Sequence, residues 1–184
     1  MAASKQMTHL DRVKKLSHAI GITISQTNDE QTMLDTICRL IVEEGGYCMA
    51  WVGFPSPLKD QDVVVASHFG IDDGYLKEIR ISWKNTESGR GITGTAIRTS
   101  VTQVNQDFLN NPNMLPWRDA ALKRGYQSSI AIPLDKADGV FGALMIYARE
   151  PQAFEAEEVE ILEFVVRNIS KAIAWFRAHI ATPQ

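Results

Sequence analysis

The stretch Gly125–Ala148, GYQSSIAIPLDKADGVFGALMIYA, decides the fold, because it holds two apolar runs joined by a short polar link. The runs 128–134 and 140–147 each have the length of a strand and are rich in branched and aromatic residues. The Asp-Gly pair at the end of the link, Asp138-Gly139, supplies the positive φ that a tight hairpin turn requires. We therefore predict that the two runs pair as an antiparallel hairpin.

Neither predicted strand alternates between apolar and polar residues, so both faces of the hairpin are apolar. In the first strand, the two faces carry Ile130, Ile132 and Leu134 against Ala131 and Pro133; in the second, they carry Val140, Leu144 and Ile146 against Phe141, Ala143, Met145 and Tyr147. A sheet that is apolar on both faces has to be covered on both. The hairpin is therefore expected in the middle layer of a three-layer domain.

Composition and charge exclude several classes of protein. The chain has 184 residues, of which 45% are hydrophobic and 22% charged, as in an ordinary globular domain. Its net charge of −3 and its lack of a basic cluster argue against nucleic acid as a partner. No apolar run reaches the roughly 18 residues of a membrane span, and the N-terminus lacks the apolar core of a signal peptide. Two cysteines, Cys38 and Cys48, fit a reduced compartment, so we expect a cytoplasmic location.

The remaining periodicities predict the order of the other elements. Helical spacing predicts helices over 7–25 and, after caps at 27–29, up to the glycines 45–46, and the longest helix over 155–180. Further strands are expected at 47–53, 63–69, 79–83 and 101–104, with short helices near 71–78, 91–100 and 116–124 and loops at 55–62, 84–91 and 107–115. This order predicts an α+β fold: a central antiparallel sheet of five or six strands, long helices on one face, and short helices and loops over a ligand pocket on the other.

Several fragments in this order resemble the GAF domain family. They are AWVG at 50–53, the pair Gly91 and Gly94 followed by AIR, VNQD at 104–107, PWRDAALKRGYQSSIAIPL at 116–134, GVFGALMIYA at 139–148 and AFEAEEVEILE at 153–163. The resemblance covers residues 28–174. It implies a GAF domain there, an N-terminal signalling or dimerisation helix at 1–27, and the end of a C-terminal signalling helix with a linker at 175–184.

The resemblance implies a regulatory module that binds a small ligand between the sheet and the roofing loops, rather than an enzyme. In this family, terminal helices pass the ligand state to an output domain, and this chain looks most like sensory domains of bacterial histidine kinases and of cyclic-di-GMP signalling proteins. The output domain would be covalently linked outside this sequence. The residue patterns of the cyclic-nucleotide-binding and bilin-binding members are missing, and the two cysteines do not fall in loops over the pocket, as free-methionine-sulfoxide reductases of this fold require.

The candidate ligand-binding residues are aromatic and polar side chains predicted to converge on the roofed face of the sheet. They are Trp51, Tyr75, Trp83, Asp107, Trp117, Tyr126 and Ser128. For the aromatic residues, filling of a smaller core is the alternative to lining a pocket. For Asp107, the alternative is to order its loop by accepting backbone N–H bonds.

Other polar residues offer weaker candidates. One of the two hydroxyls at Ser128-Ser129 is expected to face the cavity, and Arg98 and Arg118 either hold an anion or lie on the solvated surface. His68 at a strand end is more typical of a polar edge residue than of a haem ligand. No catalytic triad spacing, metal motif or phosphate-cradling loop is present, so the sequence predicts neither a metal nor a catalytic residue, and it does not identify a cofactor.

The last helix carries apolar residues at alternating steps of three and four, the pattern of a helix-packing seam. We expect a homodimer through both terminal helices, with the interface residues Leu10, Val13, Val159, Leu162, Val166, Ile169, Ile173 and Phe176. The alternative is that the seam packs on the first helix of the same chain. Replacing both Ile173 and Phe176 by charged residues should give a folded monomer if the dimer prediction holds.

Three functions are consistent with these patterns. The first is a small-molecule sensor that relays ligand state to an output domain. The second is a stand-alone thiol-dependent sulfoxide reductase on the same fold, and the third is a dimerisation module with a filled pocket. Native mass spectrometry would identify a co-purifying ligand and so distinguish a sensor from a ligand-free dimerisation module.

Overall fold

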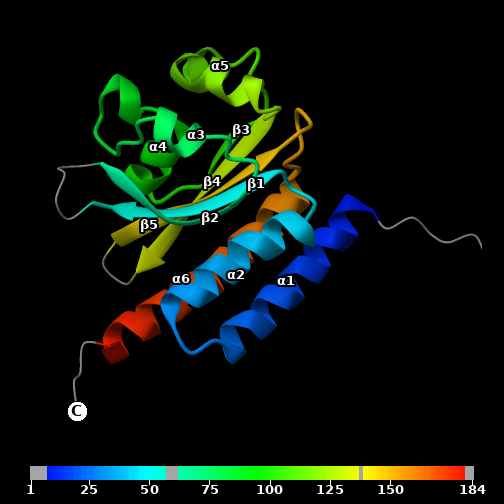
Figure 1. The fold of residues 1–184 in the computed structure, drawn as a ribbon, viewed down its shortest axis with the longest axis vertical. Helices are drawn as coiled ribbons and strands as arrows, with labels where there is room; N and C mark the ends of the chain where they lie inside the picture. Colours follow the sequence, from blue (N-terminus) through cyan, green and yellow to red (C-terminus); the bar gives the residue numbers. More distant parts are fainter. Residues whose placement is uncertain (1–7, 57–61, 137–138, 181–184) are drawn as a thin grey trace, which may run out of the picture.

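The computed structural model describes residues 8–56, 62–136 and 139–180, and Figure 1 shows the fold. Its helices are α1 (His9–Gln26), α2 (Glu30–Glu43), α3 (Tyr75–Glu78), α4 (Ile92–Thr99), α5 (Leu115–Lys123) and α6 (Ala156–Ile180). Its strands are β1 (Met49–Pro55), β2 (Val63–Gly70), β3 (Gln103–Asn105), β4 (Ser128–Lys136) and β5 (Gly139–Ala148). Two single 3₁₀ turns, η1 (Glu87–Gly89) and η2 (Pro112–Met114), lie in the loops. The predicted helix start at Met7, the centre of the turn at 55–62, the link at 137–138 and the linker at 181–184 fall outside the described residues.

The five strands form one sheet in the order β2-β1-β5-β4-β3, and every neighbouring pair is antiparallel. The predicted hairpin is β4–β5 at the centre of this sheet, which confirms the prediction of a central antiparallel layer. The prediction of a sixth strand at 79–83 is wrong, because that segment forms only an isolated bridge between Asp62 and Ser82. The Ser82 hydroxyl accepts a hydrogen bond from the Lys84 amide at 3.1 Å, a local side-chain contact of the kind that competes with ladder pairing.

Helices cover both faces of the sheet, as Figure 1 shows: α1, α2 and α6 lie on one side, and α3, α4 and α5 form a roof on the other. The period of two along the central strands explains these two cores. From the hairpin, Ile130, Ile132, Leu134, Leu144 and Ile146 pack on the helix side. Ala131, Ala143, Met145 and Tyr147 pack under the roof. The α+β fold and its three layers are therefore as predicted.

One detail of the hairpin pattern is wrong at its turn. Leu134 pairs with Gly142, but Asp135 pairs with Val140, so Phe141 is an extra residue in β5. A bulge of this kind reverses the faces of the residues beyond it. Phe141 consequently packs on the helix side and Val140 on the roof side, the reverse of the expected assignment.

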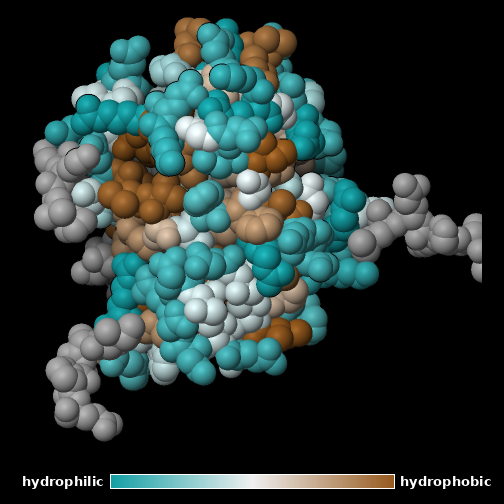
Figure 2. All heavy atoms as spheres, in the orientation of Figure 1, coloured by the Kyte–Doolittle hydropathy of each residue, from teal (hydrophilic) through white to brown (hydrophobic). Residues whose placement is uncertain are grey.

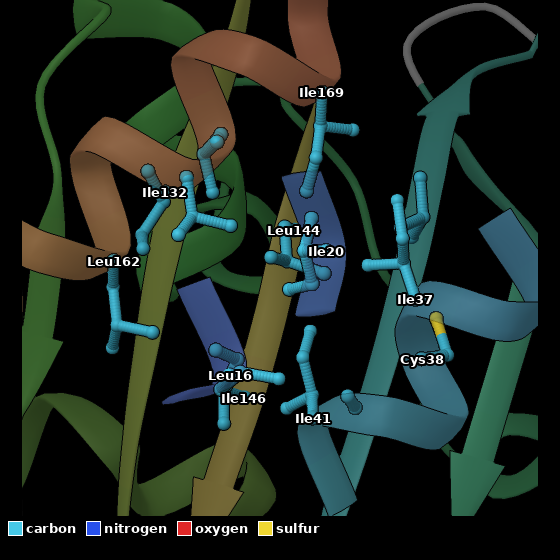
Figure 3. Packing of buried hydrophobic residues seen from close by; sticks show 14 of the residues in the cluster. Leu16, Ile20, Ile37, Cys38, Ile41, Ile132, Leu144, Ile146, Leu162 and Ile169 are labelled. Atoms are coloured by element: carbon cyan, nitrogen blue, oxygen red, sulfur yellow. The ribbon is translucent and has the colours of Figure 1, made fainter. Parts of the chain in front are cut away.

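The helix-side core joins the sheet to all three long helices. Figure 3 shows Leu16 and Ile20 of α1, Ile37 and Ile41 of α2, and Leu162 and Ile169 of α6 gathered over the hairpin residues Ile132, Leu144 and Ile146. A reciprocal pair caps the start of α1: the Asp11 amide donates to the Thr8 hydroxyl at 3.1 Å, and the Thr8 amide donates to the Asp11 carboxylate at 3.2 Å. At the same end of α1, His9 Nε2 lies 3.1 Å from the buried carboxylate of Glu158, which also accepts a hydrogen bond from Tyr47.

The predicted dimer seam lies mostly inside the chain's own core. Six of its side chains are at most 4% exposed: Val13, Leu162, Val166, Ile169, Ile173 and Phe176. Leu10 and Val159 are half-buried, and Val159 packs against the same core. The structure therefore corrects the assignment of these buried residues to an interface between two copies. The seam packs against α1 and α2 of the same chain, which is the alternative that the sequence left open.

Within residues 8–56, 62–136 and 139–180, no helix is both long enough and apolar enough to cross a membrane.

Candidate functional site

A cavity of about 30 Å³ lies between the sheet and the roof. Its floor is formed by β1, β4 and β5, and its walls by α3, the segment 79–82, η1, α4, the loop before α5, and α5 itself. The lining residues are Trp51, Tyr75, Ile79, Ile81, Ser82, Ser88, Gly91, Ile92, Thr93, Gly94, Phe108, Met114, Trp117, Ser129, Met145 and Tyr147. The site is therefore apolar and aromatic, with a few hydroxyl groups, as is typical of a small-molecule pocket.

None of these lining residues carries a formal charge. Burial is the main cause that raises the pKa of Tyr147 to about 12, and it raises the pKa of Tyr75 well above its ordinary value. Both phenols therefore stay protonated and neutral near pH 7. Within residues 8–56, 62–136 and 139–180, no group of three or more His, Cys, Asp or Glu side chains is placed to hold a metal ion.

Two of the polar groups in the cavity already have partners. The Thr93 hydroxyl donates to the Met145 sulfur at 3.0 Å, and the Trp51 indole N–H donates to the Tyr147 hydroxyl at 3.4 Å. The Ser129 hydroxyl differs, because it is buried and has no hydrogen-bond partner within the described part of the chain. A buried hydroxyl without a partner costs free energy unless a ligand or water satisfies it.

The structure brings three of the seven predicted ligand-binding residues to the cavity: Trp51, Tyr75 and Trp117. Tyr126 lies behind the lining, where its ring packs 4.7 Å from that of Tyr147 and its hydroxyl donates to the Ile71 carbonyl. Trp83 is half-buried beside the roof core, and its indole nitrogen is buried with no partner among residues the structure describes. Neither Tyr126 nor Trp83 lines the cavity, which corrects their predicted role.

The two polar residues among the predicted ligand contacts, Ser128 and Asp107, also lie outside the cavity lining. Ser128 pairs with Ala148 on the helix-facing side of the strands, and its hydroxyl donates to the Glu150 carbonyl at 2.7 Å. Asp107 orders its loop: its carboxylate accepts hydrogen bonds from the Leu109 amide at 2.8 Å and the Asn110 amide at 3.1 Å. The side chain and the backbone of Asn110 are the main causes of the lowered pKa of Asp107. Asp107 thus takes the alternative, loop-ordering role.

Ser129 lines the cavity with a hydroxyl that has no partner among the described residues, and the alternation of faces along the predicted strand could have identified it. It lies one residue after Ser128 and shares the roof-facing parity of Ala131, and it pairs with Tyr147 across the hairpin. The loop residues Phe108 and Met114 gave no comparable signal, because irregular backbone has no period from which a direction can be inferred.

Two arginines of the roof, Arg98 and Arg118, donate hydrogen bonds to backbone carbonyls instead of binding an anion. Arg98 donates to three carbonyls of the loop before α4: Trp83 at 3.0 Å, Lys84 at 3.0 Å and Gly89 at 2.6 Å. Arg118 donates to the carbonyls of Phe108 at 3.1 Å and Asn111 at 3.2 Å. These contacts replace both sequence-based interpretations, anion binding and a solvated surface position. They hold in place the segments that carry the cavity walls.

The two cysteines lie on opposite faces of the sheet. Cys38 of α2 belongs to the helix-side core, and Cys48 precedes β1 on the roof side, where its thiol donates to the Tyr147 carbonyl at 3.1 Å. Burial raises the pKa of the Cys38 thiol to about 12 and that of the Cys48 thiol to about 11. Neither thiol lines the cavity, and neither has the lowered pKa of a reactive cysteine.

Solved structures of low sequence identity share this fold. The GAF domain from a phosphoenolpyruvate-protein phosphotransferase of Coxiella burnetii superimposes with a TM-score of 0.76 at 16% identity, covering 93% of this chain and 98% of that one. The free methionine-R-sulfoxide reductase of Neisseria meningitidis, solved with its substrate, gives 0.70 at 17% identity and covers 97% and 96%. A putative GAF sensor protein from Burkholderia vietnamiensis gives 0.70 at 21% identity and covers 90% and 95%.

No curated protein matches the sequence significantly. The family model described as "GAF domain" matches residues 27–174, which is most of the chain and all of the sheet. This chain belongs to the GAF domain family.

Proposed function

We propose that this chain is a sensory module that binds a small molecule in the cavity under the roof and relays its presence through α1 and α6 to an output domain. The observation that carries the proposal is the uncharged cavity between sheet and roof, which is lined by Ser129, whose buried hydroxyl has no partner in the described residues. A ligand or water that enters the cavity can satisfy this hydroxyl, whereas the other buried serine without a hydroxyl partner among the described residues, Ser170, does not line the cavity. The putative GAF sensor protein of the same fold supports the sensory role by analogy.

The sheet provides the physical route from cavity to helices. Met145 and Tyr147 of β5 line the cavity, whereas the alternate residues Leu144 and Ile146 pack against the helix-side core. A ligand that shifts β5 therefore has to move side chains against α1 and α6, because tightly packed interiors transmit displacement. Hydrogen exchange in α1 and α6 should change when the cavity is filled.

The homodimer expected from the sequence remains a proposal, now for the outer face of the helix layer. Ile22 of α1 and Phe164 and Trp175 of α6 are 43%, 53% and 56% exposed. A second copy of this chain packed there would bury them, and Phe164→Glu should then lower the molecular mass measured by light scattering while the fold persists. Ile173→Glu should instead unfold the chain, because Ile173 lies in its own core.

The test of the sensory proposal combines native mass spectrometry of the freshly purified protein with thermal shifts against a panel of small metabolites. Ser129→Val should fill part of the cavity and abolish any shift caused by a cavity ligand. Ser170→Val is the matched control, because Ser170 is another buried serine without a hydroxyl partner among the described residues but lies on α6. If no ligand co-purifies and no metabolite shifts the wild type, the sensory proposal is wrong.

A thiol-dependent sulfoxide reductase is the second candidate function, because the free methionine-R-sulfoxide reductase of Neisseria meningitidis shares this fold over nearly the whole chain. The positions and raised pKa values of Cys38 and Cys48 argue against it. We therefore propose a regulatory domain rather than an enzyme. The cytoplasmic location and the link to a histidine kinase or to cyclic-di-GMP signalling stay predictions of the sequence.

A further inference from the structure

The polarity of the cavity limits what it can bind. The described lining offers no charged partner, and a charged ligand would lose its hydration there without gaining a counter-charge. The Ser129 hydroxyl can donate one hydrogen bond and accept others, so it suits a neutral polar group. The lining therefore favours an uncharged molecule with a hydrogen-bonding group placed opposite Ser129.

The shape of the walls favours a flat molecule. Aromatic rings from three different segments, Trp51, Trp117 and Tyr147, border the cavity, and aromatic faces bind planar groups by offset stacking or edge contacts. The present volume of about 30 Å³ is far below the roughly 150 Å³ of a cavity that holds benzene. It has room for about two water molecules, so a ring can enter only if a wall moves.

Trp117 lines both the cavity and a neighbouring groove. An open groove of about 310 Å³ lies on the other side of this side chain and is lined by Ile79, Ser88 and Trp117, which also line the cavity. The indole rests on Gly91, where an added Cβ would lie 2.8 Å from the ring. Figure 2 shows hydrophobic side chains reaching the surface between hydrophilic ones in the upper half of the molecule, where Figure 1 places α4 and the start of β2.

We propose that the cavity takes an uncharged planar organic molecule that hydrogen-bonds to Ser129, and that the Trp117 side chain admits it by turning into the neighbouring groove. This inference rests on the proposed ligand-binding function and narrows its ligand class. Glu78 and Arg80 line the groove but not the cavity, so the charged side chains of this region lie outside the cavity lining.

Three probes of nearly the same shape test the charge rule: benzamide is neutral, benzoate is an anion and benzamidinium is a cation. Calorimetric titration of the full chain should show benzamide binding at least 10-fold more tightly than either ion. Ser129→Ala should weaken benzamide binding about 5- to 10-fold, as expected for the loss of one hydrogen bond. Ser128→Ala is the matched control, since that hydroxyl bonds on the helix side, and it should leave benzamide binding unchanged.

The role of Trp117 is tested by the rate of benzamide association in stopped flow. Trp117→Ala should raise the association rate at least 5-fold, whereas Leu115→Ala, which alters an exposed side chain of the same helix, should not. Far-UV circular dichroism establishes that each variant is folded. An association rate unchanged by Trp117→Ala would overturn the gating step.

The failures of the two proposals can be told apart. If benzoate or benzamidinium binds as tightly as benzamide and Ser129→Val abolishes that binding, the neutral-ligand inference is wrong but the cavity is still a binding site. The same conclusion follows if native mass spectrometry finds a charged ligand. If no probe binds to the wild type or to Trp117→Ala, the inference is overturned, and the metabolite panel then decides the sensory proposal separately.

Discussion

Replacing Arg124 by methionine should loosen the roof, because this buried side chain joins α3 to α5. Its guanidinium donates to the carbonyls of Asp72 at 2.9 Å, Asp73 at 2.8 Å and Ala120 at 2.8 Å, and to the Glu78 carboxylate at 2.7 Å. Arg124 is only 8% exposed, so its loss leaves acceptors in a site that water reaches poorly. The methionine variant keeps much of the apolar stem and removes the donors.

The expected destabilisation is about 4 kcal/mol. Three lost hydrogen bonds to carbonyls contribute about 1 kcal/mol each, and the loss of the cation–π contact with Tyr75 contributes about 1 kcal/mol more. That contact spans 5.3 Å from the guanidinium carbon to the ring centroid. For a chain of this length, about 4 kcal/mol lowers Tm by about 8–16 °C.

Urea denaturation followed by circular dichroism measures this change, and Arg80→Met is the matched control. Arg80 forms its ion pair with Asp62 at 3.2 Å while its side chain is 74% exposed, so its replacement should cost less than about 1 kcal/mol. If Arg124→Met costs no more than the control does, the roof does not depend on this side chain and our account of its rigidity is wrong.

Three further predictions concern backbone space, pH and thiol chemistry. Gly94→Ala should destabilise the domain by about 2 kcal/mol, because the added Cβ would collide with two backbone carbonyls. Gly21→Ala should instead stabilise the domain by about 0.5–1 kcal/mol, because Gly21 lies in α1 with open space around it. Thermal unfolding of both variants checks this pair of predictions. Hydrogen bonds hold the pKa of folded Asp107 below its ordinary value of 3.8. The charged carboxylate therefore stabilises the fold above that pH, and this contribution is lost as the pH falls through the folded pKa. The difference in free energy of unfolding between the wild type and Asp107→Ala should accordingly disappear as the pH falls below about 4. Cys38 and Cys48 should react with a thiol reagent far more slowly in the folded protein than in urea, and replacing both by alanine should leave ligand binding intact; rapid reaction of the folded protein would favour the reductase instead.

The sheet and its two covered faces could be predicted from the sequence because strands carry a period of two. Ile130 and Ala131 are adjacent, and the alternation alone sends them to the helix side and the roof side. The same argument failed at Phe141, because a bulge adds one residue and exchanges the faces beyond it. Nothing in the composition of the turn indicates that insertion.

The dimer seam failed for a different reason. A step of three and four residues marks a helix that packs on another helix, but it does not say whether that helix belongs to the same chain. Ile169 and Ile173 of α6 face the core that α1 and α2 complete, so the partner was intramolecular. Phe164 and Trp175 are exposed on the same helix, but they do not disturb its apolar spacing. The sequence therefore did not indicate that they form a separate exposed face.

The cavity was predictable only in part. Trp51 and Tyr75 lie on or beside regular elements, and their direction followed from the expected layers. The sequence-based prediction names Ser128, although the alternation along the strand favours Ser129, which pairs with the cavity residue Tyr147. Asp107 precedes the cavity residue Phe108 in the sequence, but its carboxylate accepts hydrogen bonds from neighbouring backbone amides. Only the geometry of the loop shows this local role.

Methyl NMR of methionine-labelled protein tests the central claim most directly. Met114 and Met145 line the cavity, whereas Met33 is fully buried in the helix-side core and serves as the internal reference. On titration with benzamide, the Met114 and Met145 methyl signals should shift together and saturate, and the Met33 signal should move far less. Benzamide binding that leaves Met114 and Met145 unmoved, or that shifts Met33 equally, would contradict a ligand site between the sheet and the roof.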